Sequence, residues 1–134
     1  MSLFNKRAYL LIFILSFMLS GCASTPKELE QLDANMNQYE KALLWGEYGY
    51  VLGLHKNSSL SQLEQERLQS IKVTAYQVLR TSVSKDRSKA FQLLEISYYN
   101  RAYAIVRSMK VEQEWAYEPD KQQWVVLTPF PRFK

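Results

Sequence analysis

The sequence contains few of the residues from which covalent, metal and catalytic sites are built. Of its 134 residues only Cys22 is a cysteine and only His55 is a histidine. A single cysteine can form no disulfide within the chain and no cysteine-based metal site. No Ser-His-Asp set, glycine-rich phosphate loop or His/Asp metal cluster occurs, and the three aspartates fall on a helix surface and in two turns (Asp33, Asp86 and Asp120). We therefore expect no enzymatic activity, no metal and no cofactor.

The sequence also lacks a marked excess of charge of one sign. It carries 17 Lys and Arg residues against 13 Asp and Glu residues, a formal net charge of +4. Lys6 and Arg7 lie at the N-terminus, so the chain beyond residue 21 keeps 15 basic and 13 acidic side chains, a net charge of +2. Nucleic-acid-binding domains carry clustered positive charge on one face. We therefore expect no nucleic acid among the partners.

Only one long apolar run is present, from Ala8 to Met18. It is well short of the roughly 20 residues that cross a bilayer as a helix. It follows a basic start containing Lys6 and Arg7 and precedes small residues, which is the order of a secretory signal peptide. A permanent transmembrane helix is the less favoured alternative.

The four residues after this run, Leu19-Ser20-Gly21-Cys22, resemble the lipobox of bacterial lipoproteins at every position. The resemblance implies diacylglycerol on the Cys22 sulfur, cleavage after Gly21 and acylation of the new amino terminus, so that the protein is held on a membrane through lipid. An ordinary signal peptide with a chance cysteine is the alternative.

The lipobox divides the chain into a lipoprotein signal peptide (1–21), a lipidated tether (22–26) and one domain (27–134). Ala23 and Ser24 lack the aspartate that the lipoprotein family associates with retention at the inner membrane. The resemblance therefore implies a location on the periplasmic face of the outer membrane.

The first part of the domain has the pattern of helices. Thr25-Pro26-Lys27-Glu28 predicts a helix start with Thr25 as the N-cap and Pro26 in the first turn. An apolar stripe at spacings of three and four follows, which fits packing on a sheet better than the seam of a coiled coil: Leu29, Leu32, Met36, Tyr39 and Leu43. The helix ends at Trp45-Gly46-Glu47. Two more helices are predicted, one from Tyr48 to the region of residues 53–55 and one over residues 61–70.

From Ile71 the apolar period changes to two, which predicts antiparallel strands over 71–83, 90–99, 103–117 and 122–128. In the long third strand the odd positions are mostly apolar and the even ones mostly polar, so one face of the sheet is buried by helices. The turns predict a register that places Leu94 opposite Arg107 and Trp115 opposite Trp124. The fold class is α+β.

Three segments of the sheet region carry a second resemblance: Val106-Arg107-Ser108, Gln113-Glu114-Trp115-Ala116-Tyr117 and residues 124–131. They resemble small uncharacterised proteobacterial lipoproteins that have a nuclear transport factor 2-like (cystatin-like) roll. The resemblance implies a four-stranded sheet that curls around the N-terminal helices and leaves a conical cavity. A flat sheet with helices on one side is the rival architecture. Neither determines the activity, because this roll carries enzymes, binders and adaptors alike.

Two polar residues, Arg107 and Gln113, fall on the predicted apolar face. A buried charge needs a partner, so one hypothesis is a pocket whose guanidinium binds an anion, lined by Tyr98, Tyr103 and Trp115. The favoured alternative is that Arg107 reaches a helix carboxylate, Glu40 or Glu47, and that Gln113 bonds to backbone.

The chain also has nine Tyr and three Trp residues, which either cover the core or form an interaction surface. We favour a lipid-anchored envelope protein that acts by binding. The first hypothesis is an adaptor or accessory component that docks an envelope protein through its edge strand or aromatics. The alternative is a binder of a small amphipathic ligand in the cavity of the roll.

Overall fold

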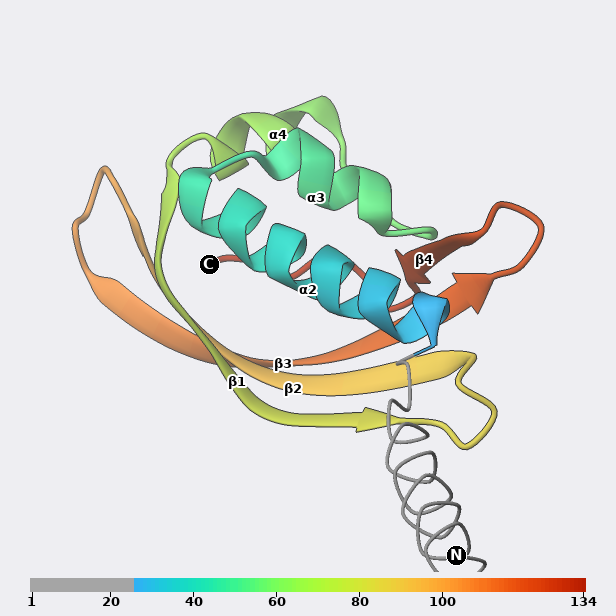
Figure 1. Cartoon of the computed structure of the whole chain (residues 1–134). Coiled ribbons are helices and arrows are strands. Elements are labelled where there is room, and N and C mark those ends of the chain that lie inside the picture. The colour runs from blue at the N-terminus through green and yellow to red at the C-terminus, as the bar shows by residue number, and fades with distance from the viewer. Residues whose placement is uncertain (1–25) are drawn as a thin grey trace, which may run out of the picture.

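A computed structural model describes residues 26–134, which form an α+β fold with three helices followed by a four-stranded antiparallel sheet (Figure 1). The elements are α2 (Lys27–Trp45), α3 (Tyr48–Leu54), α4 (Gln62–Leu68), β1 (Ile71–Val83), β2 (Lys89–Asn100), β3 (Val106–Glu118) and β4 (Gln123–Val126). The predicted fold class and the order of helices before strands are confirmed. The predicted signal peptide, the lipobox and most of the tether lie outside the described residues.

Helix α2 is the central element of the fold. Its predicted apolar stripe faces the sheet, with Tyr39 and Leu43 fully buried, and the left-handed Gly46 (φ 76°) ends it as predicted. The predicted start is wrong by one position. Pro26 has an extended ψ of 140° and lies before the first helical residue, and its carbonyl accepts the Leu29 amide. Thr25 lies outside the described residues.

The two shorter helices lie above α2 on the side away from the sheet (Figure 1). In α3 the Tyr48 hydroxyl donates to the Ile71 carbonyl at 2.7 Å, which fastens this helix to the start of β1. Helix α4 begins with a capping box, in which Ser61 accepts the Glu64 amide and Glu64 accepts the Ser61 amide. The predicted helix over 61–70 is therefore confirmed in a shorter form.

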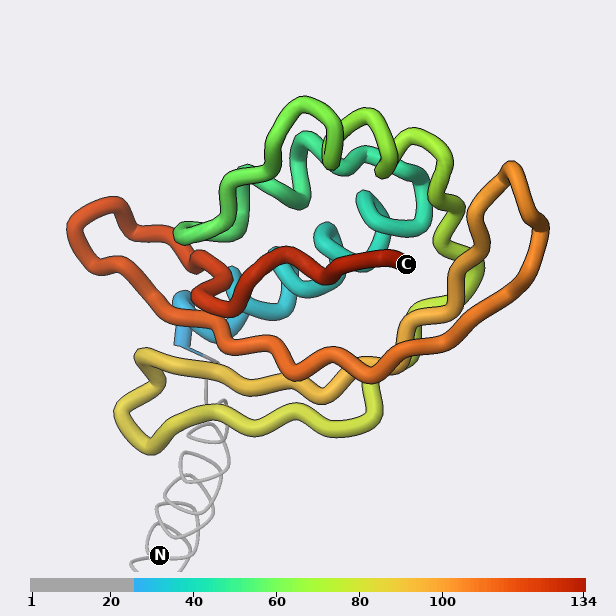
Figure 2. The backbone as a smooth tube through the Cα atoms, turned by 180° about the vertical axis from the view of Figure 1, so that it is seen from behind, coloured from blue at the N-terminus to red at the C-terminus, as the bar shows by residue number. Residues whose placement is uncertain are grey.

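The four strands follow one another in the order β1-β2-β3-β4, and the sheet curves around α2 (Figures 1 and 2). Alternate residues of β2 are buried on the concave face, among them Leu94 and Ile96. The Tyr39 ring of α2 meets Trp115 of β3 edge-on, with ring centroids 5.8 Å apart. The hydrophobic core therefore lies between α2 and the concave face of the sheet.

The predicted register between β2 and β3 is wrong by four residues. Leu94 lies opposite Val111, and Arg107 lies opposite Tyr98. The connecting loop is longer than predicted because Ala104 takes a left-handed conformation (φ 52°) and its amide bonds to the Asn100 carbonyl, so β3 begins at Val106 and not at residue 103. The predicted faces survive because an even shift keeps every side chain on its side of the sheet.

The predicted register between β3 and β4 is wrong by two residues. Trp115 lies opposite Val126 and Trp124 lies opposite Tyr117, so the two tryptophans are not a cross-strand pair. The turn is two residues wider than expected because Gln122 takes a left-handed conformation (φ 51°) and donates its amide to the Pro119 carbonyl. Both tryptophans still point inward.

Candidate functional site

The structure distributes the five predicted site residues over three places. Gln113 and Trp115 lie buried under α2, and Tyr103 stands exposed in the loop between β2 and β3. Arg107 and Tyr98 lie side by side across two strands, where both bond to the Lys134 carbonyl at 3.4 and 3.5 Å. The five side chains therefore do not line one pocket.

The expected environments of Arg107 and Gln113 also differ from those in the structure. Arg107 is exposed, since β3 extends past α2 at this end, and its bond is to backbone rather than to Glu40 or Glu47. Gln113 is buried, but its Oε1 accepts the Trp115 indole N–H at 2.7 Å instead of a backbone amide. The register shift moves Arg107 toward the end of the sheet, opposite Tyr98. Gln113 bonds to Trp115 because the two side chains are neighbours on the same face of β3.

His55 occupies the centre of a buried hydrogen-bonded chain that sequence reasoning missed. Its Nδ1 lies 2.7 Å from the Thr128 carbonyl, and its Nε2 lies 2.9 Å from the Tyr39 hydroxyl. A carbonyl can only accept, so Nδ1 carries the proton and Nε2 accepts from Tyr39. Burial lowers the pKa of His55, against the opposing effect of the Thr128 bond. His55 is therefore a neutral imidazole with both nitrogens in use.

Tyr39 is the α2 member of this chain, and its ring packs edge-on against Trp115 of β3. Burial raises the pKa of its hydroxyl well above the ordinary value of 10, and the neighbouring Gln113 side chain opposes that rise in part. The Gln113 Nε2 and the Oε1 of Gln92, which lies opposite it in the sheet, make no hydrogen bond to another described group. The hydrogen bonds of His55 join α2, the end of α3 and the segment after β4, so their evident role is to hold these three together.

No sequence motif could have identified the His55 network. His55 and Thr128 are 73 residues apart, and the contact depends on where β4 ends. Its only local signal is that the histidine follows the apolar residues Leu52 and Leu54 of α3. Phe130 closes the network on one side, with its ring edge-on to the imidazole at 5.5 Å. We assign His55 no catalytic role, since the protein itself occupies both nitrogens.

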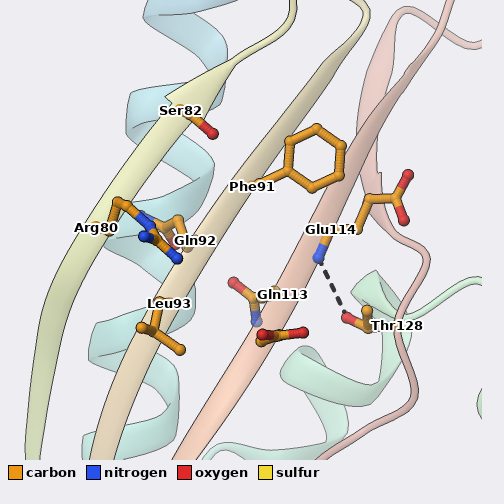
Figure 3. A pocket seen from close by; sticks show the side chains of 9 residues that line it. Arg80, Ser82, Phe91, Gln92, Leu93, Gln113, Glu114 and Thr128 are labelled. Carbon is orange, nitrogen blue, oxygen red and sulfur yellow. Dashed lines mark hydrogen bonds between the residues drawn. The ribbon is translucent and has the colours of Figure 1, made fainter.

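A hollow of about 440 Å³ lies on the sheet where three strands meet (Figure 3). Its walls are two cross-strand rows, Arg80-Leu93-Glu112 and Ser82-Phe91-Glu114. Both rows are on the convex face, because the intervening Gln92 and Gln113 side chains are buried on the opposite face. Lys89 pairs with Glu114 at 3.1 Å, and the Glu114 amide donates to the Thr128 hydroxyl. The hollow is thus a shallow surface depression between two rows of side chains, and one of its charged residues, Glu114, is already paired.

The end of the molecule around the β2–β3 loop exposes large apolar side chains. Tyr103 is 74% exposed, Ile105 61% and Val106 63%, and these three residues are called the distal surface below. A groove of about 540 Å³ lies next to it, between α4 and the C-terminal segment. Exposed apolar residues gathered in one place mark interaction sites in soluble domains. The distal surface and the groove are therefore the candidate functional sites.

Across residues 26–134 no three His, Cys, Asp or Glu side chains gather where they could hold a metal ion. Within the same residues no helix has both the length and the apolar character to cross a bilayer.

The chain was compared with protein-family models, with curated proteins and with solved structures. None of the three comparisons found a match. The function must therefore be argued from the geometry and the sequence.

Proposed function

We propose that this protein is a lipid-anchored component of a bacterial cell envelope that acts by binding another protein, as an adaptor or accessory subunit of an envelope assembly. The observation that carries the proposal is the contrast between a filled interior and an exposed apolar distal surface. Tyr39, Leu94 and Trp115 are fully buried under α2, whereas Ile105 and Val106 are mostly exposed. Exposed apolar clusters of this kind are typical of protein-binding surfaces.

The proposed anchor is the acylated Cys22, on the periplasmic face of the outer membrane. Helix α2 begins five residues later, at Lys27, and its first turn is fastened to the β3–β4 end by the Trp124 indole, which donates to the Glu28 carbonyl at 2.8 Å. The 19 residues of α2 extend over about 28 Å toward the other end of the sheet. The anchored end and the distal surface would thus lie far apart, as an adaptor requires.

We also propose that the curved sheet is a roll of the cystatin-like type. The support is the order of elements, with helices before an antiparallel meander, and the curvature of the sheet around α2 (Figure 1). In this fold the ligand-binding alternative would place a small amphipathic molecule inside the roll beside Arg107. The geometry does not favour that alternative, because core side chains fill the concave face and Arg107 is exposed at its end.

The anchor is tested by envelope fractionation of the full chain with Cys22→Ala. We expect the variant to accumulate unprocessed or to leave the membrane fraction, since the sulfur is the proposed attachment point for lipid. A matched control is Ser24→Ala, which keeps the cysteine. Normal processing and unchanged membrane retention of the Cys22 variant would show that the anchor is wrongly assigned.

The docking role is tested by crosslinked affinity purification of the tagged full chain. The variant Ile105→Ser/Val106→Ser should lose a co-purifying envelope protein by about tenfold or more, as expected when interface anchors are removed. The matched control Leu79→Ser/Phe91→Ser removes apolar groups that are also exposed, at 40% and 45%, from β1 and β2. Equal recovery by the two variants would exclude the distal surface as the docking site.

A further inference from the structure

The groove beside the distal surface has an apolar floor that belongs to the core. It lies between α4, the β2–β3 loop and the C-terminal segment, which runs back toward that loop (Figure 2). Its apolar lining consists of Leu60, Leu68, Ile71, Tyr103, Phe130 and Phe133, together with Pro131. Leu68, Ile71 and Phe130 are buried residues of the main cluster, and Leu60 and Phe133 pack against it, so most of this floor is fixed by the fold.

The C-terminal wall of the groove is held by specific contacts. The Phe130 amide donates to the Ser58 hydroxyl at 2.8 Å, and the Lys134 amide donates to the Tyr98 hydroxyl at 3.2 Å. Phe133 meets the Tyr98 ring edge-on at 4.9 Å. The wall therefore keeps its place without a ligand, and a preformed groove binds with less ordering cost.

The rim of the groove carries three basic side chains. Arg67, Arg132 and Lys134 are exposed, and none of them is among the ion pairs of the described residues. The one acidic lining residue, Glu64, uses its carboxylate to accept from the amide and hydroxyl of Ser61 at 2.9 and 3.0 Å. The charged side chains that line the groove therefore sum to +2, over an apolar floor.

We infer that this groove binds a single-chain anionic amphiphile with a carboxylate head, that is, a fatty acid. The floor would take the alkyl chain, and the arginines of the rim would take the carboxylate through charge-assisted hydrogen bonds. The volume of about 540 Å³ lies within the range of ligand sites. This site differs in ligand from the protein-docking role proposed above and shares only Tyr103 with the distal surface. It does not include Ile105 or Val106, so either proposal can fail alone.

The inference is tested with two photoreactive probes of equal length, a dodecanoic acid and a dodecylammonium ion, each with a diazirine on the chain. The full chain is placed in nanodiscs of neutral phosphatidylcholine, labelled, and mapped by mass spectrometry. We expect the acid to label the peptides covering 60–71 and 130–134 about tenfold more than the ammonium ion does. Equal labelling by both probes, or labelling concentrated elsewhere, would overturn the inference.

Variants of the full chain separate charge from general apolar affinity. Arg67→Gln/Arg132→Gln should remove most of the preference for the acid, whereas Arg80→Gln, a surface arginine on β1 outside the groove, should leave it unchanged. Leu60→Glu should lower acid labelling by placing a carboxylate against the chain. Retained preference in the double arginine variant would contradict the inference.

Competition experiments distinguish a free fatty acid from the headgroup of an anionic lipid as the ligand of the groove. Unlabelled dodecanoate should displace the acid probe. Displacement by phosphatidylglycerol in the nanodisc, with none by dodecanoate, would assign the groove to a lipid headgroup and overturn the fatty-acid assignment.

Discussion

The two ends of the sheet differ in how completely other elements cover them. At the β3–β4 end, Trp124 bonds to the first turn of α2, Gln31 donates to the Gln122 carbonyl, and Lys56 pairs with Glu118 at 3.4 Å. At the β2–β3 end the loop from residue 101 to 105 and the first residue of β3 carry the exposed distal surface, and the Arg101 amide bonds to the Ser70 carbonyl. The β3–β4 turn is thus fastened to the helices, whereas the β2–β3 end keeps large apolar side chains exposed.

The difference has a simple geometric origin in element lengths. Strands of 13 residues, such as β1 and β3, extend over about 43 Å, whereas the 19 residues of α2 reach over about 28 Å. The helix cannot cover the whole sheet. β3 is exposed toward its start, at the β2–β3 end, and β1 is exposed toward its own end, which lies at the opposite, β3–β4 end of the sheet. Of the two uncovered strand ends, the one at the β2–β3 end carries the more exposed apolar side chains, with Ile105 at 61% against Val83 at 42%.

The largest effect is expected from Trp115→Ala in the closed part. The ring is fully buried between α2 and the sheet and donates to Gln113. Its removal should lower the free energy of unfolding by about 3–5 kcal/mol, as for other large aromatic truncations in cores. Denaturant unfolding of the full chain measures this. A loss below about 1 kcal/mol would mean that the interior is not packed as described.

The next effect is expected at the His55 network. Tyr39→Phe removes the donor to His55 Nε2 and leaves that buried acceptor without its partner. The free energy of unfolding should fall by about 1–3 kcal/mol, the cost of one unsatisfied buried group. Tyr50→Phe in α3, where the tyrosine is exposed, is the matched control and should change little. Equal effects of the two substitutions would contradict the assigned hydrogen bond.

The pH dependence of stability should report on the same network. The folded-state pKa of His55 lies below its ordinary value of 6.5, so the unfolded chain takes up a proton first as the pH falls. Stability is therefore fully present above pH 6.5 and decreases below it, toward the folded pKa. Denaturant unfolding at pH 7.5 and pH 5.5 should show this loss in the native chain and a smaller one in His55→Gln. Identical losses would show that other groups cause it.

The smallest effect on stability is expected on the distal surface. Ile105→Ser and Val106→Ser alter exposed side chains and should change the free energy of unfolding by no more than about 0.5 kcal/mol. Their effect should fall on partner recovery instead. A large loss of stability from either substitution would mean that the open end also supports the fold, and the contrast between the two ends would disappear.

The sequence predicts what depends on local pattern. The stripe on α2, its end at Gly46 and the bounds of β1 follow from spacing and from glycine at a left-handed position, and the structure confirms them. The same holds for the start of the helix predicted from residue 61, which begins at Gln62 with Ser61 as its N-cap. These features depend on interactions between residues that are close in the chain, so a single sequence is enough to predict them.

The sequence does not predict what depends on loop conformation or on distant contacts. Both register errors arise at left-handed residues other than glycine, Ala104 and Gln122, where composition gives no signal. The position of Arg107 depends on that register and on Lys134, 27 residues away. His55 is fixed by a carbonyl 73 residues away. The candidate sites could therefore be found only once the strand registers and the loops at the ends of the sheet were known.

The central claim, that the open end of the sheet is the docking surface, is tested most directly by site-specific photo-crosslinking in cells. A benzophenone amino acid is introduced into the lipidated full chain at Ile105, and separately at Phe91 on the convex face. We predict one specific crosslinked envelope protein from position 105 and none from position 91. No crosslink at position 105, or the same protein at both positions, would contradict the claim.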